Sequence, residues 1–392
     1  MKFQVAKSDL EFALSTVSGA LSAGDADISS HFVFRIKPGT TDQLEVLTAS
    51  NRSYAQCTVP KALVTDIGMP FTIEGSRLRG WISVIGDVAL DVETLADQEV
   101  QVKAGKYTQR FRSLDPAKFQ YMDKTVATAE LKSTIKAKRL VAAFKAAKAF
   151  ASTDDSNKPD VVVLDIKDGL LMATDKSSVV VFFTLKDLTD CTFRVHVKDV
   201  SNMSGFLESI DDTVEVLDAK RLVFLRRVSD GAIYGETRYQ IEFPTLNPSN
   251  EVDQRIWTVK SDDLRRAARN GFFGATKYDN RLFLGAVNAE GCIPVSMKTD
   301  TNSKVATTVP VACQEVINDP TAPDVPTDGF PVSYQHIMAL LDAFPGDETI
   351  SLGVNVHPAK KKRYIRVTKK VFEDPADDSC DTYVFVMAGM VW

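Results

Sequence analysis

The chain opens with Met1-Lys2-Phe3-Gln4-Val5, a short alternating run that continues into an amphipathic segment at residues 8–21. The first pattern is typical of a strand and the second of a helix. The pair of patterns returns twice, at residues 129–136 with 139–151 and at residues 256–259 with 261–270. The sequence therefore predicts one unit of about 125 residues that is repeated three times.

A second strand-to-helix pattern lies halfway through each unit, at residues 71–85, 193–210 and 330–344. Strand-like runs surround these patterns, at residues 44–59, 161–185 and 281–297. We therefore expect an α+β fold of three β-rich domains with two helices each. Their expected bounds are residues 1–127, 128–250 and 251–392.

The composition fits three small soluble domains. The chain has 392 residues, of which 44% are hydrophobic, and this is enough for a core in each third. No apolar run approaches the roughly 18 residues that a membrane span needs. The first residues lead into a strand rather than a signal peptide. We expect a cytoplasmic protein with no membrane partner.

Residues that would mark a catalytic or metal site are scattered. The five cysteines are never spaced C-x-x-C, and the four histidines lie far apart in the sequence. The nucleophile motif G-x-S-x-G and the phosphate-binding motif G-x-x-x-x-G-K-[ST] do not occur. We expect a protein that is not an enzyme and that uses no metal or cofactor.

Residues 131–150, in the second unit, contain six basic residues and no acidic one, although the formal net charge of the chain is -5. On a helix, Leu140, Phe144 and Ala147 would share one apolar face, with Lys138 and Lys145 opposite. The basic residues of this stretch that we expect to contact nucleic acid are Lys132, Lys136, Lys138, Lys145 and Lys148.

The third unit repeats this arrangement. Leu264 and Ala268 would face inward, while a basic group would lie on the other side, namely Arg265, Arg266 and Arg269. The first helix of the first unit is not basic, so Arg77 and Arg79 are the candidates there. Such stripes are either solvated faces or contacts to a phosphate backbone, and their recurrence in an acidic chain favours nucleic acid.

Six short stretches occur in order and at suitable spacing along the whole chain. They are Met1-Lys2-Phe3-x-Val5, Val17-Ser18-Gly19-x-Leu21, Ala173-Thr174-Asp175, Phe243-Pro244, Phe330-x-Val332-Ser333-Tyr334, and Tyr383-Val384-Phe385-Val386-Met387-Ala388-Gly389-Met390. Together they resemble the bacterial DNA sliding clamp, the DNA polymerase III beta subunit family.

The resemblance implies a head-to-tail homodimer that closes a six-domain ring, with helices inside and sheets outside. Such a ring encircles double-stranded DNA without reading its sequence, and tethers the DNA polymerase as a processivity factor. The polymerase and the clamp loader would bind through short peptides. The matching pocket positions are Leu164, Thr174, Val179, Pro244, Met387 and Met390. The matching dimer interface has Phe111 and Leu114 on one copy, and Phe272 and Phe273 on the other.

This chain departs from the family pattern at three places. Lys176-Ser177-Ser178 replaces the usual Gly-His-Arg, the chain ends in Met390-Val391-Trp392, and the loop at residues 23–27 is acidic. This divergence fits a phage-encoded clamp that acts in an infected host cell. Two other readings stay open, a non-catalytic β-rich structural or assembly protein of a virus and a hydrolase with an unrecognised site.

Overall fold

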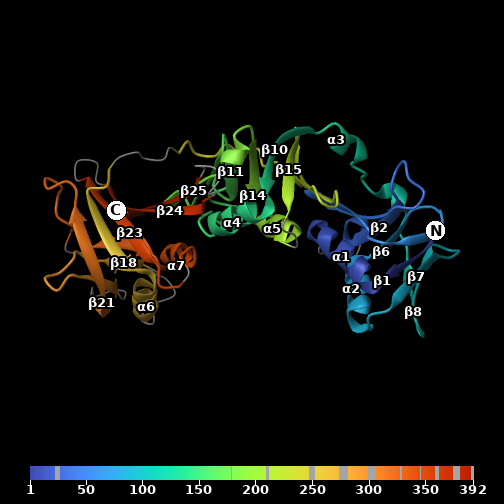
Figure 1. Ribbon diagram of the computed structural model, residues 1–392, viewed down its shortest axis with the longest axis horizontal. Coiled ribbons are helices and arrows are strands. Elements are labelled where there is room, and N and C mark those ends of the chain that lie inside the picture. The colour runs from blue at the N-terminus through green and yellow to red at the C-terminus, as the bar shows by residue number, and fades with distance from the viewer. Residues whose placement is uncertain are drawn as a thin grey trace. The chain divides into compact units, whose positions relative to one another are not determined.

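The computed structural model describes residues 1–22, 27–177, 179–208, 212–246, 252–272, 281–298, 305–326, 329–344, 346–357, 362–373 and 380–389. These residues form two compact units, each of which is described by itself. The first unit comprises Met1–Val141 and Lys198–Tyr239, and the second comprises Ala142–Val197 and Gln240–Trp392. Both units combine antiparallel sheets with helices, so the expected α+β class is confirmed (Figure 1). The division into three domains stays a prediction, since residues 128–250 contribute to both units.

The first unit contains two sheets and four complete α-helices among its described residues. Its elements are β1 Lys2–Ala6, α1 Lys7–Val17, β2 His31–Ile36, β3 Leu44–Ala49, β4 Ser53–Thr58, β5 Leu63–Asp66, β6 Phe71–Glu74, α2 Gly75–Val84, β7 Ala89–Thr94, β8 Glu99–Ala104, β9 Tyr107–Arg112, α3 Asp123–Ala127, β10 Glu130–Lys136, α5 Val200–Glu208, β15 Thr213–Ala219, β16 Leu222–Arg227 and β17 Ile233–Thr237. Helix α4, Ala137–Lys148, begins in this unit and ends in the second.

The second unit is built on one 12-stranded sheet. Its elements are β11 Val163–Lys167, β12 Leu170–Thr174, β13 Val179–Thr184, β14 Thr192–His196, β18 Arg255–Lys260, α6 Ser261–Phe272, β19 Arg281–Leu284, β20 Cys292–Lys298, β21 Val305–Ile317, β22 Phe330–Ser333, α7 Tyr334–Asp342, β23 Thr349–His357, β24 Lys362–Glu373 and β25 Cys380–Gly389. No helix among the described residues is both long and apolar enough to span a bilayer.

The repeat predicted from the sequence is visible as one order of elements that occurs three times. Each repeat runs strand, helix, three strands, strand, helix, three strands. The repeats begin at β1, β10 and β18, and they end at β9, β17 and β25. Strand β5 and the five-residue helix α3 are additions to the first repeat that the sequence pattern did not predict.

The opening strand and helix form for the expected reasons. Along β1, buried and exposed residues alternate, and Phe3 and Val5 point into the core. In α1 the buried residues include Leu10, Leu14 and Val17, which recur at the spacing of one helical face. This apolar face seats the helix against β3 and β4, so the polar face is left for solvent or a partner.

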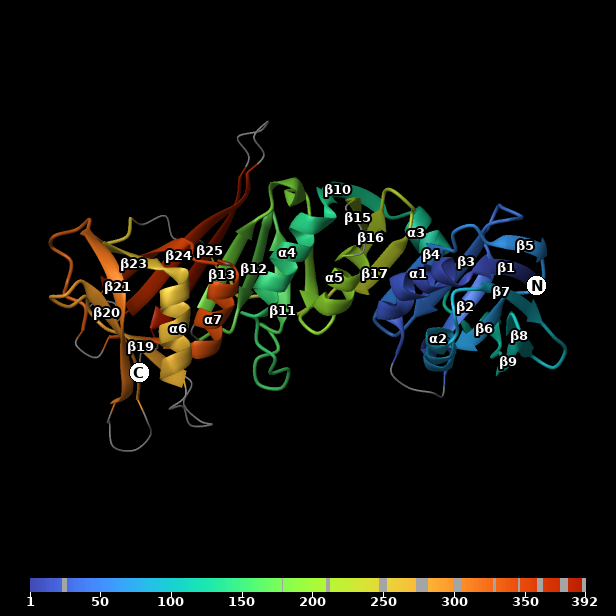
Figure 2. The same ribbon diagram turned by 60° about the horizontal axis from the view of Figure 1, so that its bottom comes forward.

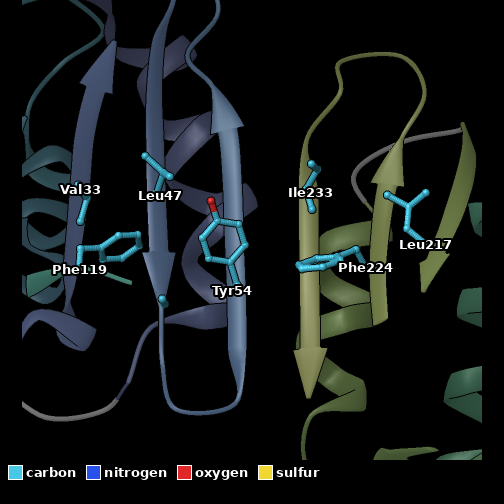
Figure 3. Close-up of a cluster of buried hydrophobic side chains, with 8 residues drawn as sticks. Val33, Leu47, Tyr54, Phe119, Leu217, Phe224 and Ile233 are labelled. Atoms are coloured by element: carbon cyan, nitrogen blue, oxygen red, sulfur yellow. The ribbon is translucent and has the colours of Figure 1, made fainter. Parts of the chain in front are cut away.

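Successive repeats share sheets, because the last strand of one repeat pairs with the fourth strand of the repeat before it. In the first unit β17 pairs antiparallel with β4 and completes an eight-stranded sheet. Aromatic and aliphatic side chains cover this seam, with Tyr54 on β4 next to Ile233 on β17 and Phe224 on β16 (Figure 3). Phe119, from the segment after β9, packs on Tyr54 with ring centroids 6.5 Å apart.

The second unit has the same kind of seam. Strand β25, the last of the third repeat, pairs antiparallel with β13, the fourth of the second repeat (Figure 2). Val179 lies opposite Met387, and Phe183 lies opposite Tyr383 with ring centroids 4.3 Å apart. One rule of strand pairing therefore joins the repeats in both units.

A buried carboxyl group lies at the seam of the first unit. Glu236 on β17 is 0% exposed, and its Oε2 accepts hydrogen bonds from Ser53 Oγ at 2.7 Å and Tyr234 Oη at 3.2 Å. Its other oxygen, Oε1, has no hydrogen-bond partner in the described part of the chain. Burial, reinforced by the charge of Asp199 and only partly opposed by Arg52, raises the pKa of Glu236 to about 7.

We expect this carboxyl group to make the first unit less stable as pH rises. The pKa of Glu236 lies above its ordinary value of 4.5, so the folded state holds a proton that the unfolded state releases. Stability should fall between about pH 4.5 and about pH 7, by on the order of 3 kcal/mol at most. Denaturant unfolding at several pH values measures this loss. Glu236→Gln should remove this pH dependence of the free energy of unfolding. The same pH dependence in both proteins would contradict the assignment.

Candidate functional site

Helix α4 presents the basic face that the sequence predicts. Leu140, Phe144 and Ala147 are fully buried, whereas Lys138 and Lys145 are exposed. Lys148 is half-buried at the end of the helix. The apolar stripe therefore fixes the rotation of the helix, and this rotation turns two lysines outward.

Strand β10 leads into α4 and adds two of the predicted cations. Lys136, at the end of the strand, is exposed. Lys132 is half-buried, and its Nζ lies 2.7 Å from Oε1 of Glu130. Lys136 is thus the more accessible of the two for an anionic partner.

Helix α6 divides its three predicted arginines into two kinds. Arg266 and Arg269 are exposed, and Arg266, which is 75% exposed, makes an ion pair with Asp263 on its own helix. Arg265 is 14% exposed and donates hydrogen bonds to the carbonyls of Leu341 at 2.7 Å and Phe344 at 3.1 Å.

The contacts of Arg265 correct the expectation of one arginine cluster. Leu341 and Phe344 lie at the carboxyl end of α7, where carbonyl groups lack partners within the helix. A guanidinium group there satisfies the carbonyls and complements the helix dipole. Arg265 therefore fixes α7 against α6, and the accessible cations of this helix are Arg266 and Arg269.

In the first repeat the predicted cations lie on the second helix, α2. Arg77 and Arg79 are both exposed, and Nε of Arg77 lies 2.8 Å from Oε2 of Glu74. Arg79 lines a cavity of about 510 Å³ between α1 and α2, together with Glu11 and Ser15. Helix α1 itself carries no basic residue after its first position, Lys7.

Three of the predicted pocket residues, Thr174, Val179 and Met387, lie at the seam between β13 and β25. Thr174 donates a hydrogen bond from Oγ1 to the carbonyl of Val179 at 2.6 Å, and Val179 lies opposite Met387. These three side chains and Leu164 are at most 2% exposed, whereas Pro244 is half-buried. Met390 lies outside the described residues.

The described residues that follow Thr174 form, together with Lys158, a rim of local contacts next to β13. Lys158 donates from Nζ to the carbonyl of Asp175 at 2.9 Å and to Ser177 Oγ at 3.1 Å. Lys176 pairs with Asp160 at 2.6 Å. This rim therefore contains two lysines that are tied down by local contacts.

The residues expected at a dimer interface are only partly accessible. Phe111 on β9 is 6% exposed and packs edge-on against Trp81, with ring centroids 6.3 Å apart, and Leu114 is half-buried. Phe272 ends α6, but its side chain lies outside the described part of the chain, as does the whole of Phe273. Since Phe111 faces inward, β9 offers its backbone rather than an apolar patch.

The strand pairing points to two surfaces that the sequence pattern did not reveal. The rule that joins the repeats pairs the last strand of one repeat with the fourth strand of another. The last strand of the first repeat, β9, and the fourth strand of the third repeat, β21, have no such partner among the described strands. Strand β9 pairs only with β8 there, and residues 305–312 of β21 pair only with β20. An exposed strand edge is a ready template for pairing with another chain.

The free edge of β9 presents a row of backbone groups. The amide of Ser113 donates to the carbonyl of Gln98 at 2.7 Å, which fixes the alternation of hydrogen-bonded pairs between β8 and β9. By that alternation the N–H and C=O groups of Thr108, Arg110 and Arg112 face away from β8. All three residues are exposed.

Sequence comparisons place the chain in no family, while structural comparisons are decisive for the fold. No family model and no curated protein matches the sequence. The beta subunit of DNA polymerase III from Thermotoga maritima aligns with a TM-score of 0.76 at 16% identity, over 99% of this chain and 98% of that one.

Two further solved structures agree. The DNA polymerase III beta chain of Streptococcus pneumoniae gives a TM-score of 0.78 at 16% identity, covering 98% of this chain and 99% of its own. The DNA polymerase sliding clamp of Bacillus subtilis gives 0.76 at 12% identity, covering 99% and 98%. The chain thus has the fold of these proteins over nearly its full length.

Proposed function

We propose that this chain, which folds like bacterial DNA polymerase III beta subunits, is a non-catalytic DNA sliding clamp. Two copies would close a ring around duplex DNA and act as a processivity factor for a DNA polymerase. The observation that carries the proposal is the pair of free strand edges, β9 and β21. These are the two strands that take part in no seam among the described strands of one chain.

Closure would follow the rule that already operates twice within the chain. Strand β9 of one copy would pair antiparallel with β21 of the next, as β17 pairs with β4 and β25 pairs with β13. The contact joins different surfaces of two identical chains, and such a head-to-tail contact closes a ring when the rotation fits. All six repeats of the two chains would then be joined by seams of the same kind.

Inside the ring, duplex DNA would be contacted through charge, without readout of its bases. Among the cations predicted from the sequence, the exposed ones are Lys136, Lys138, Lys145, Arg77, Arg79, Arg266 and Arg269, with Lys132 and Lys148 less exposed. Long flexible basic side chains attract phosphates without reading bases. A few such contacts allow sliding, while the closed ring prevents escape.

The mass of the protein in solution tests ring formation. The chain has a mass of 43.1 kDa, and light scattering at micromolar concentration should give the mass of two chains. A stable monomer would contradict the ring, and a monomer or open polymer is what the alternative of a viral structural or assembly protein predicts.

We place the binding surface for the polymerase and the clamp loader at the seam formed by β13 and β25, and assign Pro244 and Met390 to it from the sequence. Apolar and methionine side chains suit a surface that accepts short peptides. The rim of Lys158 and Lys176 would give this clamp a choice of partners different from that of relatives with a Gly-His-Arg rim.

Removal of residues 390–392 should weaken binding of the replicative polymerase at least tenfold, because part of the proposed peptide surface is lost. Ring assembly should be unchanged, since β25 ends at Gly389 and its pairing with β13 is retained. Pull-down of the polymerase, with light scattering on the same sample, measures both. Full polymerase binding by the shortened chain would rule out this position for the surface.

A further inference from the structure

The free edge of β21 contains a proline, Pro310. Proline has no backbone N–H, so its effect on a sheet depends on which neighbour the missing donor would face. The hydrogen bonds around β20 and β21 settle this direction.

Two hydrogen bonds and the strand register show that the nitrogen of Pro310 faces away from β20. The amide of Cys313 donates to the carbonyl of Gly291 at 2.8 Å, so alternate pairs from there inward are hydrogen-bonded. By that alternation the pair of Pro294 and Pro310, which lie opposite each other, is not hydrogen-bonded. The carbonyl of Pro294 instead accepts from Gly285 at 2.9 Å, on the side away from β21.

The row of backbone N–H groups on the free edge of β21 is therefore incomplete. Thr308 and Ala312 present N–H groups to the free edge, and Pro310, which lies between them and is exposed, presents none. The equivalent strands within the chain, β4 and β13, contain no proline, and neither does β9. The two internal seams thus have a donor at every position, and the free edge lacks one.

We propose that Pro310 leaves the seam between two copies one hydrogen bond short in each interface, so that this seam opens in preference to the two seams within the chain. The inference rests on the proposed head-to-tail ring. A clamp must open to admit DNA. The missing hydrogen bond makes the seam between copies the place that opens, without weakening either unit of the chain. The same gap protects the free edge of a single chain from indiscriminate strand pairing.

Replacement of the proline tests the proposal, because Pro310→Ala restores the missing donor. The ring has two copies of the interface, so the dissociation constant of the dimer should fall roughly 5- to 100-fold. Fluorescence-detected sedimentation at nanomolar concentration measures that constant, and the rate of subunit exchange should slow in parallel.

Pro294→Ala is the matched control. It makes the same chemical change in the facing residue, but its new N–H points toward β19, inside the sheet. We expect it to leave dimerisation unchanged. A dimeric native protein with an unchanged or weaker Pro310→Ala dimer would overturn the inference and leave the ring intact. A native protein that is monomeric at every concentration would overturn the ring and the inference together.

Discussion

Arg110→Pro should convert the dimer into a monomer under conditions where the native protein is fully dimeric. The backbone N–H of Arg110 is the middle one of the three that face outward from β9. The substitution removes that donor from both interfaces of the dimer. It also adds the pyrrolidine ring of proline, which crowds an incoming strand. We expect the dimer to be weakened about a hundredfold or more.

The fold should tolerate this change, since the ladder between β8 and β9 does not use the N–H of Arg110. Circular dichroism and the unfolding midpoint of the monomer check that expectation. Arg110→Ala is the control, because it removes the side chain and its ion pair with Glu99 but keeps the donor. A variant that carries the proline and stays dimeric would show that β9 is not the interface.

Reversal of the exposed helix charges should have the second large effect. Lys138, Lys145, Arg266 and Arg269, all changed to Glu, should shorten the lifetime of the protein on DNA at least tenfold. Each phosphate contact contributes a slope of roughly -0.9 to the dependence of log affinity on log salt, so the salt dependence should also become shallower. Arg265 is left unchanged because it holds the end of α7.

A control with the same change in net charge separates the effect of where the cations lie from the effect of how many are reversed. Lys2, Lys61, Lys167 and Lys220 are exposed and lie on strands or turns rather than on helices. Their reversal should change the lifetime on DNA much less. Dissociation from a surface-bound duplex measured at several salt concentrations compares the two sets, and equal effects would argue against the helices as the DNA-facing side.

The sequence predicts those parts of the fold that depend on local periodicity. Helix α6 was expected at residues 261–270 and is found at Ser261–Phe272, with Leu264 and Ala268 buried as expected. The apolar stripe sets the rotation of each helix without reference to the rest of the chain. The repeated order of elements follows for the same reason.

Non-local contacts were not predictable in this way. Arg265 has the spacing of a solvated residue, but it donates to two carbonyls at the carboxyl end of α7, more than seventy positions away in sequence. Phe111 suggested an apolar interface, yet it packs inward on Trp81. The periodicity of a strand shows which face is buried, but not which strand will lie at its edge. The free edges of β9 and β21 therefore became visible only when the strand pairs were known.

Retention on circular DNA tests the central claim most directly. Dissociated chains would be concentrated in the presence of a nicked circular duplex, and the complex would be separated from free protein at a salt concentration that suppresses phosphate contacts. We expect the protein to stay on the circle and to leave within the time needed to cut it once with a restriction enzyme. Equally fast loss from circular and linear DNA would contradict a ring that encircles the duplex.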